Sequence, residues 1–131
     1  MAVIEDLPFA IHVVGESTGN TWTGDFRAKT ALSRRDIITR DKIRREMLGS
    51  GGGEVEQHAA DLAMAYSELK IRITEAPEWF TSADYGLDML DEAPMAAIYQ
   101  KAIKIFTDET ERKLKAAKAK SDELKKELDT K

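Results

Sequence analysis

Two short stretches near the N-terminus alternate apolar and polar residues with the two-residue period of a half-buried β-strand. The first covers residues 9–14 and the second covers residues 22–28. The segment between them is rich in Gly, Asn, Ser and Thr, which are turn residues. The pattern predicts a β-hairpin with one apolar face, which must cover a helix or a partner because a lone hairpin is only marginally stable in water. The residues predicted on this face are Phe9, Ile11, Val13, Trp22 and Phe26.

The next segment carries the signals of a helix start and a helix end. Ser33 can cap a first turn, and Asp36 follows three residues later, as in a capping box. A helix is therefore predicted from about Arg34, and Gly49 supplies its C-terminal cap. The glycines at positions 51–53 predict a flexible joint after it.

Apolar residues beyond this joint recur at alternating intervals of four and three, which places them on one stripe of an α-helix. We expect this second helix to begin near Glu54 and to be ended by Pro77, because the residue before a proline is pushed out of helical geometry. An acidic loop should follow, in which Trp79, Phe80 and Tyr85 cluster. The stripe consists of Val55, Ala59, Leu62, Tyr66, Leu69 and Ile73.

A third helix is predicted with Asp91 as its cap and Pro94 in its first turn, where a missing N–H is tolerated. From residue 108 to residue 131 the chain holds fifteen charged residues of both signs. These residues include the i,i+4 pairs Asp108/Arg112, Glu109/Lys113 and Glu111/Lys115, and together with the alanines they favour a helical arm that need not bury much surface. The arm keeps a thin heptad-like seam, which can pair weakly with another helix. The seam consists of Leu114, Ala117, Ser121, Leu124 and Leu128.

These elements predict an α+β fold, in which an N-terminal β-hairpin packs on a small bundle of three helices and the last helix is prolonged as a charged arm. We divide the chain into a hairpin and helical domain at residues 1–107 and the arm at residues 108–131. The length of 131 residues suits one domain, and the lack of cysteine excludes disulfides and thiolate metal sites. No apolar run approaches membrane-spanning length, and acids stand near the N-terminus where a secretory signal carries Lys or Arg, so we expect a protein without membrane contacts that stays where it is made.

Residues suited to catalysis or metal binding are sparse. His12 lies in a predicted strand, and His58 has Asp61 three residues on, a spacing that is more typical of a surface pair than of a site. The chain has no cysteine nucleophile and no serine in a Gly-x-Ser-x-Gly elbow. We therefore expect a protein without catalytic residues, metal ligands or cofactor.

Charge is segregated along the chain. Residues 27–45 hold eight basic residues against two acidic ones, whereas residues 74–97 hold six acidic residues and no basic one. The two segments can face each other within one molecule, can both be solvated, or the basic one can meet a partner's acidic surface. Nucleic-acid binding is less favoured, because the net charge is −4 and the arginines are spread around the helix. The aromatic cluster is either a local core or an anchor for a partner's pocket. The candidate partner-binding residues are Arg34, Arg35, Arg40, Arg44, Arg45, Trp79, Phe80 and Tyr85.

Two stretches, VVGESTGNTWTGDFRAKTALSRRDIITRDKIRREMLG and ITEAPEWFTSADYGLDMLDE, resemble small structural or assembly proteins of tailed bacteriophages. In those proteins a hairpin of the type V-x-G-x-x-T-G-x-x-W-x-G-x-F-x-x-K leads into a helix that opens with Leu-Ser and is rich in Arg and Asp. A later A-P-x-W-[WF] element precedes Gly-Leu-Asp and a terminal helix. The resemblance covers about residues 13–99.

This resemblance implies a non-enzymatic virion protein, such as a minor head, connector or decoration component, that contacts capsid, connector or tail subunits in several copies per particle. It implies a location in the virion, and in the host cytoplasm during assembly. A tail assembly chaperone that binds unassembled tail subunits is the alternative, and a nucleic-acid-binding accessory protein is a further one.

Overall fold

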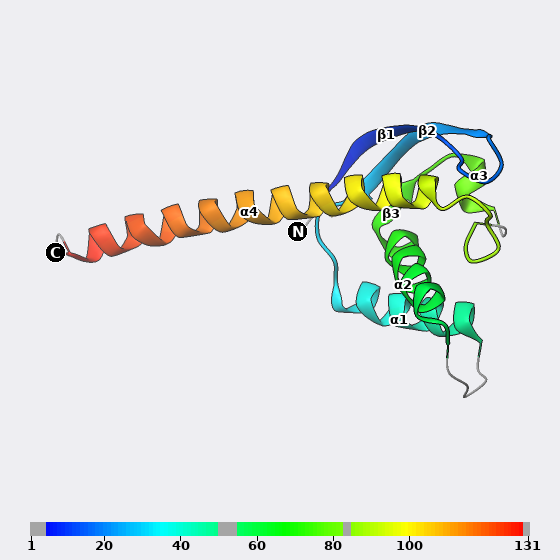
Figure 1. The fold of residues 1–131 in the computed structure, drawn as a ribbon. Coiled ribbons are helices and arrows are strands. Elements are labelled where there is room, and N and C mark those ends of the chain that lie inside the picture. Colours follow the sequence, from blue (N-terminus) through cyan, green and yellow to red (C-terminus); the bar gives the residue numbers. More distant parts are fainter. Residues whose placement is uncertain (1–4, 50–54, 83–84, 130–131) are drawn as a thin grey trace.

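The computed structural model describes residues 5–49, 55–82 and 85–129, and it has the predicted α+β architecture (Figure 1). The predicted joint at positions 51–53 and residue 54 lie outside the described residues. The second helix begins at Gln57, later than predicted, so Val55 of the predicted stripe precedes the helix and is 43% exposed. Three strands form one antiparallel sheet in the order β1-β2-β3. In chain order the elements are β1 (Asp6–Val14), β2 (Thr21–Lys29), α1 (Arg34–Leu48), α2 (Gln57–Arg72), β3 (Ile73–Glu75), α3 (Glu78–Thr81) and α4 (Ala93–Asp129).

Strands β1 and β2 form the predicted hairpin, and its apolar face packs inward. Phe9 lies opposite Phe26 in the register, and their rings stack with centroids 5.2 Å apart. Ile11 and Phe26 are buried in the hydrophobic core, and Val13 packs against it. The first half of α4 lies alongside the two strands (Figure 1), and it contacts both of them. The hairpin is therefore stabilised by a helix of its own chain.

Helix α2 ends at Arg72, so the expectation that Pro77 ends it is wrong. The chain leaves the helix because the next residues pair with β2, with Ile73 opposite Ala28 and Glu75 opposite Arg27. This pairing satisfies backbone groups on an edge of the hairpin that would otherwise be unpaired. Ile73, which the helical stripe included, is thus a strand residue. Pro77 instead comes directly before the one-turn helix α3.

Helix α1 begins and ends where the sequence predicts. The Ser33 hydroxyl accepts a hydrogen bond from the Asp36 N–H at 3.1 Å, and the Asp36 carboxylate accepts one from the Ser33 N–H at 2.9 Å. Gly49 ends the helix with a φ of +81°, a value that favours glycine. None of the fifteen residues of α1 is buried, and its neighbour in the fold is α2. This helix therefore lies on the outside of the molecule.

Helix α4 consists of two contrasting parts. Its first part buries Met95, Ile98 and Ala102. Beyond Thr110 every described residue is exposed, and this part projects away from the body of the molecule (Figure 1). The helix runs without interruption through the boundary predicted between residues 107 and 108.

The ion pairs of α4 differ from the expected ones. Asp108 pairs with Lys104 at 2.7 Å, and Glu109 pairs with Arg112 at 2.7 Å. The expected pairs Asp108/Arg112, Glu109/Lys113 and Glu111/Lys115 are not among the ion pairs of the described residues. Asp108 instead meets the cation four residues earlier and Glu109 the cation three residues later, a choice that spacing alone leaves open.

Asp91 does not cap α4, and its carboxylate instead binds the turn of the hairpin. Its Oδ1 accepts hydrogen bonds from the N–H groups of Ser17 at 2.8 Å and Thr18 at 3.0 Å. Its Oδ2 accepts from the Trp22 indole N–H at 2.8 Å and from the Thr18 hydroxyl. These bonds lower the pKa of Asp91 to about 2, although the residue is only 1% exposed. The bond from the Thr18 hydroxyl contributes most to this lowering of the pKa.

The cap of α4 comes from the hairpin in return. The Glu16 carboxylate accepts hydrogen bonds from the N–H groups of Glu92 and Ala93, two donors at the start of the helix that lack helical partners. The bond from the Glu92 N–H is also the main reason that the pKa of Glu16 is lowered. We call this reciprocal exchange between Glu16 and Asp91 the latch. It fixes the turn of the hairpin to the beginning of α4.

Candidate interaction surfaces

Two of the five candidate arginines of α1 are partly enclosed, and one of them binds α2. Arg40 donates from Nη1 to Glu68 at 2.8 Å and from Nη2 to Asp41 at 3.0 Å. Glu68 also accepts from the Nε of Arg72 at 2.8 Å, and both of these residues are 7% exposed. The hydrogen bonds that Arg40 donates, first to Glu68 and then to Asp41, raise the pKa of Arg40. Arg44 is half-buried, with its Nε atom enclosed.

This arrangement makes Arg40 a structural residue. It neutralises Glu68, the one carboxylate that α2 buries, and removing it would leave Glu68 with a single cationic partner. Arg40 therefore serves to hold α1 against α2, and it is poorly placed to bind a separate molecule.

The other three candidate arginines point into solvent on the opposite side of α1. At about 100° per residue, Arg34, Ile38 and Arg45 lie within about 40° of one another around the helix axis. Arg35 and Lys42 lie beside them, and all five side chains are exposed. Ile38 stands among these cations with 53% of its surface accessible. We call this surface the basic face of α1, and it consists of Arg34, Arg35, Ile38, Lys42 and Arg45.

The acidic segment does not neutralise this face. Asp91 binds the hairpin turn, and Glu92 lies 2.9 Å from the His58 ring. Among the described residues, the ion pairs of α1 join Asp36 to Lys29 and Arg40 to Asp41 and Glu68, and none of them reaches residues 74–97. The basic and acidic segments thus have separate partners, and the basic face of α1 remains available.

The aromatic cluster is mainly a core. Phe80 is 4% exposed and Tyr85 is 3% exposed, and their ring centroids are 4.4 Å apart. Burial raises the pKa of the Tyr85 hydroxyl. Trp79 is half-buried, and its indole N–H donates to the Thr23 carbonyl at 3.1 Å. Of the two interpretations of this cluster, the local core describes Phe80 and Tyr85.

Trp22 of the hairpin face joins the same cluster. Its ring meets the edge of Trp79 with centroids 5.0 Å apart. The hairpin face and the aromatic loop therefore pack on each other, and the buried side chains Ile11, Phe26, Phe80 and Tyr85 offer little surface to a partner.

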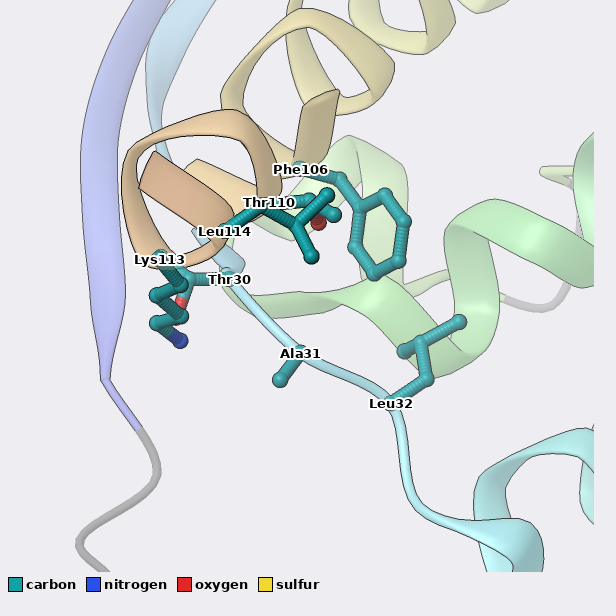
Figure 2. Close-up of a pocket in the computed structure, with 7 residues that line it drawn as sticks. All are labelled: Thr30, Ala31, Leu32, Phe106, Thr110, Lys113 and Leu114. Atoms are coloured by element: carbon teal, nitrogen blue, oxygen red, sulfur yellow. The ribbon is translucent and has the colours of Figure 1, made fainter. Parts of the chain in front are cut away.

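A groove that the sequence analysis missed lies where the chain passes from β2 to α1 beneath α4 (Figure 2). It has a volume of about 300 Å³ and a mainly apolar lining. Phe106, Thr110 and Leu114 form its α4 wall, and their spacing of four residues is the only signal in the sequence that places them on one side. We call it the α4 groove, and its lining residues are Thr30, Ala31, Leu32, Phe106, Thr110, Lys113 and Leu114.

The arm seam predicted from the sequence continues directly from this groove. Leu114 belongs to both, and it is 65% exposed. Leu124 and Leu128 are 54% and 72% exposed, so nothing within the described molecule covers the seam. Exposed leucines in a row on one helix are typical of a surface that another helix covers.

The histidines do not gather ligands around them. His58 pairs with Glu92, whereas Asp61, its expected neighbour, accepts a hydrogen bond from Gln57 at 2.9 Å. Across residues 5–49, 55–82 and 85–129, no three His, Asp or Glu side chains lie close enough together to hold a metal ion. In the same part of the chain, no helix has the length and apolar content needed to cross a membrane.

Comparison with known proteins adds no family to this description. No protein-family model matches the chain, and neither a curated protein nor a solved structure is significantly similar to it.

Proposed function

We propose that this chain is a non-enzymatic structural protein of a tailed-bacteriophage particle, a minor head, connector or decoration component that docks on neighbouring virion subunits. The observation that carries the docking is the basic face of α1, which lies on a helix without a single buried residue. This helix touches the core only through the half-buried Met47, and it turns three arginines and a lysine outward, so it is suited to contact another surface.

The residues that carry the resemblance to phage proteins have clear structural roles in this fold. Thr18 and Trp22 donate to Asp91, and a Cβ atom at Gly15 would lie 2.0 Å from the Asp91 carboxylate. Gly24 makes room for Pro77, whose Cγ would lie 2.5 Å from a Cβ atom there. The residues of this pattern thus build the scaffold of this chain, and partner choice is left to exposed surfaces such as the basic face of α1.

An acidic protein surface is the partner that suits this face best. Ile38 stands exposed among the cations, as in interfaces where an apolar centre is surrounded by a polar rim. Phosphate recognition favours an uninterrupted row of cations, and a net charge of −4 opposes DNA binding over longer distances. Contacts of this kind are individually modest, but they become strong when a symmetric particle presents many of them together.

Reversal of charge on the basic face tests the proposal. The variant Arg34→Glu/Arg45→Glu should reduce incorporation of the chain into purified particles several-fold, measured by quantitative mass spectrometry against a capsid protein. The control Lys115→Glu/Lys126→Glu changes net charge equally on the exposed arm and should be incorporated normally. Equal incorporation of both variants would contradict docking through α1.

The same measurement separates the alternative functions. A chain that is abundant in infected lysate but missing from purified particles would overturn the virion role in favour of a tail assembly chaperone. Binding to duplex DNA at low salt, lost in Arg34→Glu/Arg45→Glu, would instead identify the basic face as a nucleic-acid surface.

A further inference from the structure

The arm extends much further than the core of the molecule requires. Residues 111–129 are all exposed, and at 1.5 Å per residue they add about 28 Å of helix beyond the body. Burial on the core cannot account for the leucines along this helix, because Leu114, Leu124 and Leu128 are each more than half exposed. These side chains need a partner helix if they are to leave water.

Heptad positions along the arm follow from its seam. If Leu114 occupies position a, then Ser121 and Leu128 also occupy a, and Ala117 and Leu124 occupy d. The flanking e and g positions then hold charged residues, and these decide which partner and which orientation the seam accepts. They are Glu111, Lys113, Lys118, Lys120, Lys125 and Glu127.

A parallel pair of identical arms is electrostatically unfavourable. In that orientation each g residue faces the e residue five positions later in the other helix. Lys113 would face Lys118 of the second copy, and Lys120 would face Lys125. Both contacts join like charges, and each occurs twice in a symmetric dimer.

An antiparallel pair reverses this balance. With Leu114 packed against Leu124 of the second copy, Glu111 faces Lys125 of that copy, and the same pair recurs at the other end of the seam. Like charges meet only near the two-fold axis, where Lys118 and Lys120 each lie opposite their own equivalents. The small residues Ala117 and Ser121 occupy the layers there, so the helices can approach closely.

The α4 groove fits the same register. When Leu114 lies opposite Leu124 of the second copy, Leu128 of that copy lies opposite Thr110, which lines the groove. The lining beside it includes Leu32 and Phe106 (Figure 2), and this apolar space is open to a leucine side chain arriving along the arm. Seam, charges and groove thus agree on one arrangement.

We propose that the arm pairs with the arm of a second copy of this chain in an antiparallel, two-fold symmetric dimer. Leu114 and Leu124 form the end layers of the seam, and Leu128 of each copy enters the α4 groove of the other. The interface is isologous, so it closes after two copies. The proposal is independent of docking through α1, because the dimer uses none of the residues of that face.

Sedimentation velocity over a concentration series spanning about two orders of magnitude tests the pairing. The full chain should show a monomer–dimer equilibrium. Leu124→Ser/Leu128→Ser should weaken the dimer about tenfold or more, because it removes two of the three leucines from the seam. The control Ala116→Ser/Ala119→Ser changes exposed residues outside the seam and should leave the equilibrium unchanged.

Charge variants test the orientation. Lys125→Glu should weaken an antiparallel dimer several-fold, since two glutamates would then face each other at each end. The double variant Glu111→Lys/Lys125→Glu should restore it, because the pair is rebuilt with reversed signs. In a parallel dimer, Lys125→Glu would instead strengthen the association, by relieving the contact between Lys120 and Lys125.

Three results would overturn the proposal: a chain that stays monomeric at every concentration, a dimer unaffected by Leu124→Ser/Leu128→Ser, or a dimer strengthened by Lys125→Glu. None of them bears on the incorporation of the Arg34→Glu/Arg45→Glu variant into particles. The self-association and the docking function can therefore fail or succeed separately.

Discussion

The two parts of α4 have the same secondary structure for different reasons. The first part is held by tertiary contacts, because Ile98 and Ala102 are completely buried and the latch supplies its N-terminal cap. The second part is held only by its own sequence, through alanines and ion pairs such as Glu109/Arg112. A helix can thus be obligatory for the fold at one end and dispensable at the other. Substitutions in the two parts should therefore differ widely in their cost.

Truncation of a side chain should show the largest difference in stability loss between the two parts of α4. Ile98→Ala should lower the free energy of unfolding by about 2–5 kcal/mol, since it empties space in a packed core. Leu124→Ala, at an exposed arm position, should change it by less than about 0.5 kcal/mol. Urea denaturation at a low protein concentration, which keeps the chain monomeric, measures both. Similar losses for the two variants would show that the arm packs on the body.

A methyl group at the latch should have the next largest effect. Gly15→Ala places a Cβ atom 2.0 Å from an Asp91 oxygen, so the turn and the start of α4 must move apart. We expect a loss of about 1–3 kcal/mol in the free energy of unfolding. Gly19→Ala provides a comparison within the same turn. At position 19 the φ of +75° strains the backbone of an alanine, but the added Cβ atom would have no atom within 4 Å. If Gly15→Ala lowers the free energy of unfolding no more than a substitution at an exposed position does, the latch does not hold the two segments together.

Acid should weaken the latch. The folded chain holds the pKa of Asp91 near 2, below its ordinary value of 3.8, so the unfolded chain binds the proton first. The stabilisation is complete above about pH 4 and is lost as the pH falls through the interval down to about 2. Asp91→Asn should reduce this dependence of the unfolding midpoint on pH, whereas the control Asp88→Asn, at an exposed position, should not. Parallel pH profiles for the wild type and Asp91→Asn would contradict the role of the carboxylate.

Removal of the arm should have the smallest effect on stability. A chain that ends at Thr110 should unfold within about 0.5 kcal/mol of the full chain at low concentration, because the residues beyond it bury nothing in the monomer. The helical signal in circular dichroism at 222 nm should nevertheless fall in proportion to the helical residues that the arm contributes. A large loss of stability would mean that the arm supports the body directly.

Much of the architecture was readable from local patterns. The alternation at residues 9–14 and 22–28 located the hairpin, and the capping box of Ser33 and Asp36 located the start of α1 to the residue. Both signals act between near neighbours in sequence, where spacing alone determines which groups can meet. The inward direction of Ile11 and Phe26 followed from the same alternation.

The candidate surfaces were only partly readable. Basic residues were identified from composition, but their two roles were not, because Arg40 differs from Arg45 only in what lies opposite it. The partner of Arg40 is Glu68, which belongs to another helix and comes 28 positions later in the chain. The α4 groove was missed for a similar reason, since Leu32 and Phe106 meet only after the chain has folded.

Local patterns in the sequence located the hairpin, its apolar face, the start of α1 and the charged helix that follows residue 108. Only the tertiary structure decided that Asp91 binds a turn 73 positions away rather than capping its own helix, and that residues 73–75 leave α2 to join the sheet. The physical reason is the range of the interactions. A cap or an apolar stripe acts within a few residues, whereas the choice among several possible hydrogen-bond partners depends on which distant segments packing brings together.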